Sequence, residues 1–315
     1  MNKKILIIGS RGMLGSELAQ VFSDSDVYLW DRQDIDITDK HEVREKILWL
    51  KPNIIINSAA YTAVDKAEEN RELAEQVNAY GTANLANIAS ELKAIFVHYS
   101  TDYVFSGKRK NGYKEDDKPG DPVNAYGASK LLGEQKLLEV MPLKKLKIKS
   151  EKLKVDKKRI IAVGKLENNP KARFYLIRLS WLFGKNGKNF IDTILQLAKE
   201  RDSIKVVDDQ FGKPTYAPDL AKKTRNLLEN KEPFGIYHLP NQGVCSWYEF
   251  AKQAIDFFRI KTQIVPCMSK EFPRPAKRPR YSILLNTKFR KMRHWREALR
   301  DYLKNNQNNQ DTRYR

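Results

Sequence analysis

A glycine-rich turn near the start of the chain constrains the fold more than any other feature of the sequence. The apolar run of residues 5–8 leads into Gly9-Ser10-Arg11-Gly12-Met13-Leu14-Gly15, and an amphipathic stretch over residues 14–22 follows. Glycines at such positions permit a tight turn and close packing of helix on strand, and the helix N-terminus offers unpaired N–H groups to a pyrophosphate. Although the spacing is GxxGxxG instead of GxGxxG, we predict a dinucleotide-binding turn, with cofactor contacts from Gly9, Arg11, Gly12, Met13 and Leu14.

The order of elements after this turn predicts the architecture. Further apolar runs alternate with amphipathic stretches, and strands separated by helices form parallel sheets through right-handed crossovers. The expected strands are residues 27–30, 54–57, 94–99 and 175–179, and the expected helices are 42–50, 74–92, 123–140, 190–200 and 247–258. We therefore expect an α/β fold, with a Rossmann-type doubly wound parallel sheet in residues 1–180. Residues 181–304 are expected to form mainly a smaller substrate-binding lobe, and 305–315 a polar, frayed tail.

Much of the net charge of +19 is concentrated in one segment. Residues 143–174 hold 12 lysines and arginines against three acidic residues, and they stand between an expected helix and an expected strand. We interpret this segment as an inserted, mobile hairpin or arm. Charge alone is a weak sign of nucleic-acid binding, so we do not expect that partner. No run approaches the ~18 apolar residues of a membrane span, and we expect a cytoplasmic protein.

Residues after the second expected strand bear on the choice of cofactor. Asp31 closes that strand and can accept hydrogen bonds from an adenosine ribose, which favours NAD. The neighbouring Arg32 and the turn residue Arg11 can meet a 2′-phosphate, which favours NADP. Asp36 and Ile37 are expected in a loop after a third strand, where they can contact adenine. Both NADPH and NADH therefore remain candidates.

Three further residues predict the chemistry. Tyr126 and Lys130 stand four residues apart in an expected helix, so they share one face. An ammonium beside a tyrosine stabilises the phenolate and lowers the tyrosine pKa, which suits a proton donor in carbonyl reduction. Thr101 ends an expected strand, where its hydroxyl can hold the substrate oxygen that gains negative charge. We predict that Thr101, Tyr126 and Lys130 are catalytic.

These features, together with four longer stretches, resemble the extended short-chain dehydrogenase/reductase family and, within it, the dTDP-4-dehydrorhamnose reductases. The stretches are residues 57–68, 100–105, 209–215 and 278–288, the last beginning with Arg278-Pro279. The resemblance covers nearly the whole chain except the basic segment. It implies NAD(P)H-dependent reduction of the C4 ketone of dTDP-4-dehydro-β-L-rhamnose, a step of dTDP-L-rhamnose synthesis.

The resemblance also implies roles for individual residues. Lys130 would hold the nicotinamide ribose, and the other expected cofactor contacts after the turn are Ala59, Ala60, Tyr61 and Tyr126. The expected contacts to the dTDP-sugar substrate are Asp102, Tyr103, Trp181, Gln210, Thr215 and Arg278. The sequence shows no metal-binding constellation, and Mg²⁺ is suggested by the family alone. A homodimer is left open.

Other functions are compatible with parts of this pattern. Sugar-nucleotide dehydratases need an acid after the Thr-Asp pair, and Tyr103 in that position argues against dehydration. A reductase or epimerase of another nucleotide sugar shares the three catalytic residues and stays open. So does a non-catalytic NADP-binding regulatory subunit, since the beta subunit of methionine adenosyltransferase resembles the same reductases.

Overall fold

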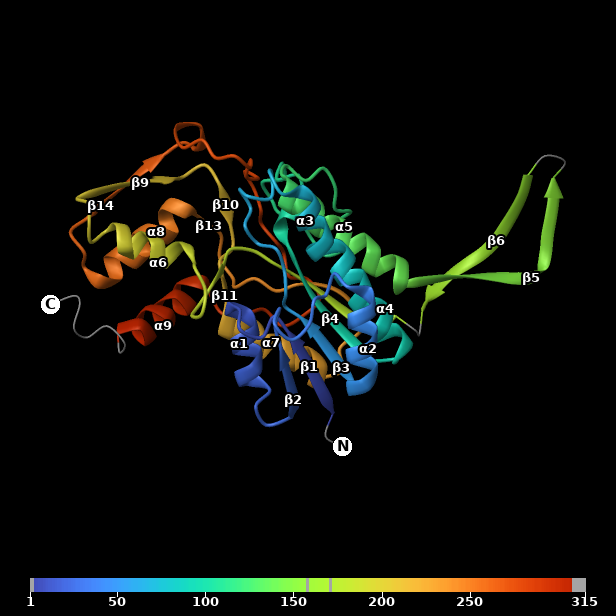
Figure 1. The fold of residues 1–315 in the computed structure, drawn as a ribbon. Coiled ribbons are helices and arrows are strands. Elements are labelled where there is room, and N and C mark those ends of the chain that lie inside the picture. The colour runs from blue at the N-terminus through green and yellow to red at the C-terminus, as the bar shows by residue number, and fades with distance from the viewer. Residues whose placement is uncertain (1–2, 157–158, 170–171, 308–315) are drawn as a thin grey trace.

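The computed structural model describes residues 3–156, 159–169 and 172–307, and it is built on one central parallel sheet. Within these residues the sheet has six strands in the order β12-β7-β4-β3-β1-β2, and every neighbouring pair runs parallel (Figure 1). Buried isoleucines, valines and leucines fill the strands, as a sheet covered on both faces requires. The strands are β1 (Lys4–Ile8), β2 (Asp26–Trp30), β3 (Ile54–Asn57), β4 (Ile95–Thr101), β7 (Phe174–Leu179) and β12 (Gly235–His238).

Helices cover both faces of this sheet, which confirms the expected doubly wound fold. One face packs against α1 (Met13–Val21) and α7 (Ala217–Glu229), with Leu18 and Leu220 among the fully buried residues. The opposite face packs against α2 (Lys40–Leu50), α4 (Thr82–Glu91) and α5 (Ala125–Val140) through Ile47, Leu85 and Leu137. Each helix buries one apolar stripe on the strands, so the two layers fix the sheet between them.

The helix expected over residues 74–92 consists of three segments. A short α3 (Arg71–Glu75) passes into a π-helical turn (Gln76–Gly81) before α4 begins. In that wide turn the Asn78 amide exchanges two hydrogen bonds with the backbone of Tyr61 and donates to the Ser129 hydroxyl at 2.9 Å. The π-turn thereby ties the loop after β3 to α5, the helix that carries Tyr126 and Lys130.

The C-terminal part of the chain contributes to both regions of the molecule. Although β12 and α7 follow residue 180, they belong to the central sheet and its covering layer, so the expected division at that residue does not account for them. The remaining helices pack around a separate apolar cluster that includes Phe250 and Trp295. This region contains α6 (Phe190–Leu197), α8 (Trp247–Phe258), α9 (Trp295–Gln307), the strand pair β9 (Ser203–Val207) and β14 (Gln263–Cys267), and the short strands β8 (Leu182–Phe183), β10 (Phe211–Gly212), β11 (Thr215–Tyr216) and β13 (Cys245–Ser246).

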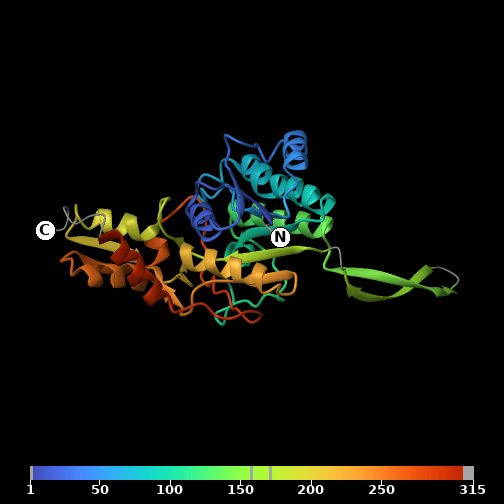
Figure 2. The same cartoon turned by 90° about the horizontal axis from the view of Figure 1, so that it is seen from below.

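The basic segment forms an antiparallel hairpin of β5 (Lys144–Asp156) and β6 (Arg159–Asn168). The hairpin extends away from the body of the molecule in both views (Figures 1 and 2). The expected tail is partly wrong, because α9 continues to Gln307, and residues 308–315 lie outside the described part of the chain. Among the described helices, none has the length and apolar character that crossing a bilayer requires.

Candidate active site

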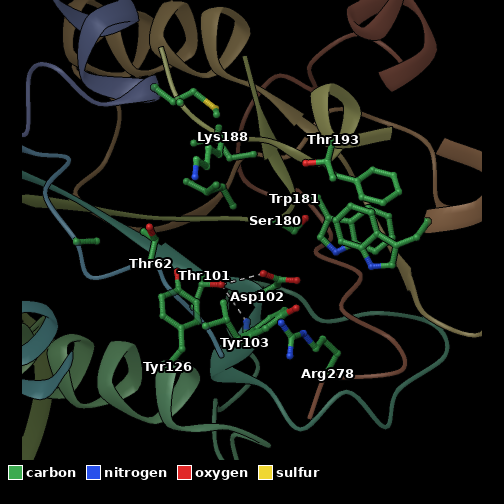
Figure 3. Close-up of a pocket in the computed structure, with 18 of the residues that line it drawn as sticks. Thr62, Thr101, Asp102, Tyr103, Tyr126, Ser180, Trp181, Lys188, Thr193 and Arg278 are labelled. Atoms are coloured by element: carbon green, nitrogen blue, oxygen red, sulfur yellow. Dashed lines mark hydrogen bonds between the residues drawn. The ribbon is translucent and has the colours of Figure 1, made fainter. Parts of the chain in front are cut away.

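A cavity of about 920 Å³ opens at the C-terminal ends of β1, β3, β4 and β7 (Figure 3). Ligands of parallel α/β sheets bind at this edge, where the loops after the strands face one another. The cavity is bordered by the glycine-rich turn, by the strand end at Thr101, by α5 and by residues of the C-terminal lobe. Of the expected site residues, those that line it are Gly12, Met13, Leu14, Ala59, Ala60, Thr101, Asp102, Tyr103, Tyr126, Lys130, Trp181, Gln210 and Arg278.

The glycine-rich turn has the backbone geometry that a pyrophosphate site needs. Gly9 has a positive φ of 77°, and a Cβ there would lie 2.7 Å from the Ala59 backbone nitrogen. At Gly15 a Cβ would come within 2.0 Å of the Gly9 carbonyl oxygen, so only glycine lets α1 approach the turn this closely. The N-cap of α1 is Gly12, and no side chain caps the helix, which leaves N–H groups facing the cavity.

Asp31 lies next to this turn and is held by backbone groups. Its carboxylate accepts hydrogen bonds from the backbone N–H of Arg11 at 3.0 Å and of Arg32 at 2.7 Å. The Arg11 guanidinium donates to the Gln33 side chain, and Arg32 is exposed. Both arginines therefore flank the carboxylate, although none of the three lines the cavity.

The expectation for Asp36 and Ile37 needs correction. Both lie in the loop between β2 and α2, because no third strand precedes them. Asp36 accepts hydrogen bonds from the backbone and hydroxyl of Thr38, while Ile37 is buried in the core against Gly81. Neither residue lines the cavity, and their contact with adenine stays a prediction.

The three predicted catalytic residues converge at the inner end of the cavity. Thr101 ends β4, whereas Tyr126 and Lys130 occupy successive turns of α5. The Lys130 ammonium is 2 % exposed; it donates to the Tyr99 carbonyl oxygen at 2.6 Å and lies 3.4 Å from Nε2 of His98. Burial, together with the Lys130 charge, holds the pKa of His98 well below its ordinary range, so the imidazole is neutral.

The protonation of the tyrosine differs from the expectation. Burial raises the pKa of Tyr126 to about 12, opposed by the nearby Thr101 hydroxyl. The Lys130 ammonium donates to the Tyr99 carbonyl and is not among the groups that shift this pKa. Burial also lowers the pKa of Lys130 to about 8, opposed by the Glu134 carboxylate. In this geometry Tyr126 carries its proton at neutral pH, so the proton is available for donation.

Asp102 is the most unusual group in the cavity. The Thr101 hydroxyl lies 2.9 Å from its Oδ1, whereas Oδ2 is buried and has no hydrogen-bond partner among the described residues. Burial raises the pKa of Asp102 to about 7, although the Ser282 and Thr101 hydroxyls act to lower it. The hydrogen bond of the Ser282 hydroxyl goes to the Phe211 carbonyl oxygen instead. A polar atom buried in this way is normally satisfied by a ligand or by water.

The aromatic wall of the cavity comes from two distant parts of the chain. Trp181 stacks on Trp247 with ring centroids 3.6 Å apart, and both line the cavity. Thr215, in contrast, is fully buried and absent from the wall. Its hydroxyl donates to the Ser180 carbonyl oxygen at 2.6 Å, so it supports the turn that carries Trp181 and does not face a ligand. Tyr61 also lies outside the wall, packed near Tyr126.

Arg278 is held across the cavity by Asp65. The guanidinium donates to both carboxylate oxygens, with Nη2 to Oδ2 at 2.9 Å, and it lowers the pKa of Asp65. The two residues are 213 positions apart, and in Figure 3 Arg278 lies beside Tyr103. This ion pair joins the loop after β3 to the C-terminal segment at the mouth of the site.

Several cavity residues were not predicted from the sequence. Asp65 stands in one of the four family-like stretches, but its pairing with Arg278 has no local signature. Others come from the C-terminal lobe, where strand and helix periodicity is less regular, and they bring aromatic, cationic and hydroxyl side chains to the site: Lys188, Phe190, Thr193, Trp247, Phe272 and Arg274. Within the described residues, no three His, Cys, Asp or Glu side chains gather as metal ligands do.

The sheet order, the glycine-rich turn and the grouping of Thr101, Tyr126 and Lys130 define an extended short-chain dehydrogenase/reductase. A family model described as the RmlD substrate binding domain matches residues 3–146 and 165–308. The chain therefore belongs to this family, that of the dTDP-4-dehydrorhamnose reductases. Between these two ranges the model leaves out residues 147–164, which include much of β5 and β6.

Similar proteins match along nearly their full length. The chain is 36% identical over 306 residues to the spore coat polysaccharide biosynthesis protein SpsK of Bacillus subtilis, covering 95% of this chain and 96% of the relative. The dTDP-4-dehydrorhamnose reductase structure of Clostridium acetobutylicum is 38% identical with a TM-score of 0.84, covering 96% of this chain and 99% of that one. The dTDP-4-dehydrorhamnose reductase structure of Bacillus anthracis, in complex with NADP, is 36% identical with a TM-score of 0.84, covering 97% of this chain and 100% of that one.

Proposed function

We propose that this protein uses NADPH or NADH to reduce the C4 ketone of dTDP-4-dehydro-β-L-rhamnose to dTDP-L-rhamnose. The observation that carries the proposal is the convergence of the glycine-rich turn and of Thr101, Tyr126 and Lys130 on one cavity. The similar reductases of known structure support the substrate and the reaction. The C4 carbon then gains a hydride, its oxygen gains a proton, and the cofactor leaves oxidised.

The residues around the turn fit a dinucleotide. Gly9 and Gly15 leave room for a pyrophosphate against the backbone, and the uncapped N-terminus of α1 offers N–H groups to it. Arg11 and Arg32 stand beside Asp31 at the end of β2, where a ribose or its 2′-phosphate would lie. The NADP complex of the Bacillus anthracis relative favours NADPH as the preferred form. When bound, the nicotinamide supplies the hydride.

The chain's own residues handle the proton and the charge on the substrate oxygen. Tyr126, protonated at neutral pH, donates the proton to the oxygen at C4. The Thr101 hydroxyl stabilises the negative charge that develops on this oxygen. The Tyr99 carbonyl fixes the ammonium of Lys130, which stands one turn after Tyr126 on α5 and would hold the nicotinamide ribose.

The outer part of the cavity fits a nucleoside diphosphate sugar. Asp102, Tyr103, Gln210 and Arg278 surround the space beside Thr101, and Trp181 supplies an apolar surface for a sugar ring. Lys188 and Arg274 also line the cavity, and their positive charge matches the negative charge of a pyrophosphate.

The experiment is the loss of nicotinamide absorbance when the purified protein meets NADPH or NADH and the keto sugar, which its upstream enzymes generate in the same reaction. We expect Tyr126→Phe to lower kcat about 100-fold to 10,000-fold with little change in cofactor affinity, because a general acid contributes that much. Cofactor binding without oxidation by the wild-type protein contradicts the proposal and favours a regulatory role or another nucleotide sugar.

A further inference from the structure

The hydroxyl of Thr101 has one proton, and two acceptors compete for it: the Asp102 carboxylate and, in the proposed reaction, the substrate oxygen. Its oxygen accepts a hydrogen bond from the Tyr103 backbone N–H at 3.2 Å and lies 2.9 Å from Oδ1 of Asp102 (Figure 3). An ionised carboxylate only accepts hydrogen bonds, so the Thr101 hydroxyl donates its hydrogen bond to Asp102 when Asp102 is ionised. Thr101 would then have no proton left for the substrate oxygen, which is the role that carbonyl reduction requires of it.

A protonated Asp102 reverses the direction of this hydrogen bond. A carboxylic acid that carries its proton on Oδ1 donates to the Thr101 oxygen, and the Thr101 proton is then free to turn toward the cavity. The two states have the same heavy-atom positions and differ only in which group donates. The state of Asp102 thus decides whether Thr101 can serve as a hydrogen-bond donor to a ligand.

The surroundings of Asp102 favour the protonated state. The residue is 3 % exposed, and its Oδ2 has no hydrogen-bond partner among the described residues. The nearby cations are engaged elsewhere, since Arg278 pairs with Asp65 and Lys130 donates to the Tyr99 carbonyl.

The titratable groups that face Asp102 supply no positive charge. Tyr103 and Tyr126 pack edge to face beside it, and burial raises the pKa of both phenols. From the C-terminal segment the neighbour is the neutral Ser282 hydroxyl. A carboxylate without a cationic partner in such a site loses its hydration and gains little in return.

We propose that Asp102 is a positioning residue that works as a carboxylic acid, donating to Thr101 so that the Thr101 hydroxyl points at the ketone oxygen of the substrate. This inference rests on the proposed reductase function. The Asp102 proton stays on the carboxyl group throughout, so the hydride and the Tyr126 proton still account for the whole reduction. Turnover is therefore expected to depend on pH. When Asp102 loses its proton, the Thr101 hydroxyl donates to the carboxylate and no longer to the substrate oxygen.

An asparagine at this position separates the proposed role from a structural one. Asp102→Asn keeps the shape of the side chain and replaces the titrating O–H with a permanent N–H donor. We therefore expect the variant to keep turnover at alkaline pH, where the wild-type protein loses it. Titration of Lys130, with a pKa of about 8, affects both proteins alike and cancels in the ratio of their kcat values.

The test measures kcat with saturating substrates from pH 6 to pH 9 for wild type, Asp102→Asn, Thr101→Val and the double variant. The ratio of kcat for Asp102→Asn to kcat for wild type is expected to rise about tenfold per pH unit above pH 7, as one proton is lost. In the Thr101→Val background the same Asn substitution is expected to produce no rise. A ratio that stays constant with pH overturns the inference while leaving the proposed function intact. A wild-type protein that does not turn over, or full activity of Thr101→Val, refutes the assigned catalytic site instead.

A second measurement does not depend on the variant or on activity. Exposed carboxyl groups are ionised at pH 6, so the infrared difference between pH 6 and pH 9 of the wild-type protein reports carboxyl groups with raised pKa values. We expect a carboxylic acid band at pH 6 that disappears at pH 9 and shifts when aspartate is labelled with carbon-13. The labelling separates Asp102 from Glu17, whose pKa is also raised by burial. Absence of an aspartate band overturns the inference.

Discussion

Replacement of Arg178 by methionine tests the buried ion pair that supports the catalytic helix. Arg178 on β7 donates to both carboxylate oxygens of Glu134 on α5, at 2.9 and 2.7 Å, and the two side chains are only 1% and 2% exposed. The Ser100 hydroxyl donates to the same carboxylate at 2.6 Å. Arg178→Met leaves the Glu134 charge buried without its cation, and breaking a pair of this kind costs about 3–5 kcal/mol.

The expected shift in melting temperature follows from the size of the chain. An unfolding entropy of about 2.1 cal/mol/K per residue corresponds to roughly 0.7 kcal/mol/K for a chain of this length, so Tm falls by about 5–7 °C. Differential scanning calorimetry measures this shift. The double variant Glu134→Leu/Arg178→Met is expected to be less destabilised than the sum of the single variants, since it leaves no unpaired charge. Strict additivity, or a wild-type Tm for Arg178→Met, would refute the reasoning.

Three further predictions follow from other parts of the structure. Gly15→Ala is expected to weaken NADPH binding at least about tenfold by calorimetry, because its Cβ would collide with the Gly9 carbonyl. Gly120→Ala, where a Cβ has free space, is the control, and equal effects of the two contradict the close-approach argument. Burial lowers the pKa of His238, so its stabilisation is complete above pH ~6.5 and is lost as the pH falls and the unfolded state binds a proton. His238→Gln should therefore reduce the slope of unfolding free energy below pH 6.5 by up to about 1.4 kcal/mol per pH unit in urea titrations. An unchanged slope in His238→Gln refutes the assignment. Replacing residues 147–164 with a short turn should leave kcat and Tm near the wild-type values, since the family model omits them; a large loss of activity would show that the hairpin takes part in the reaction.

Local patterns in the sequence were sufficient for much of the fold. The strand, glycine-rich turn and helix at the N-terminus could be predicted because the positive φ of Gly9 and the close approach of Gly15 to the Gly9 carbonyl arise within the turn itself. The placement of Tyr126 and Lys130 on one face of α5 followed from the helical repeat. The antiparallel pairing of β5 with β6 involves neighbouring segments, which is why an inserted hairpin could be anticipated.

Contacts between segments that are distant along the chain could not be predicted from local sequence patterns. The last strand of the sheet, β12, pairs with β7 some 60 residues earlier, and nothing local distinguishes it from a strand of the C-terminal lobe. Thr215 stands in a family-like stretch, yet its hydroxyl turns to the Ser180 carbonyl. Asp36 and Ile37 were misplaced because a third strand was assumed where the chain turns directly into α2.

The sequence by itself determined the class of fold and the position of the dinucleotide turn, and it supplied the candidate catalytic side chains, because these follow from local patterns along the chain. The tertiary structure decided the protonation and direction of those side chains. Burial raises the pKa values of Tyr126 and Asp102, the Tyr99 carbonyl holds Lys130, and Asp65 holds Arg278 from 213 residues away. Desolvation and hydrogen bonding depend on which atoms surround a group, and only the packed chain brings those atoms together.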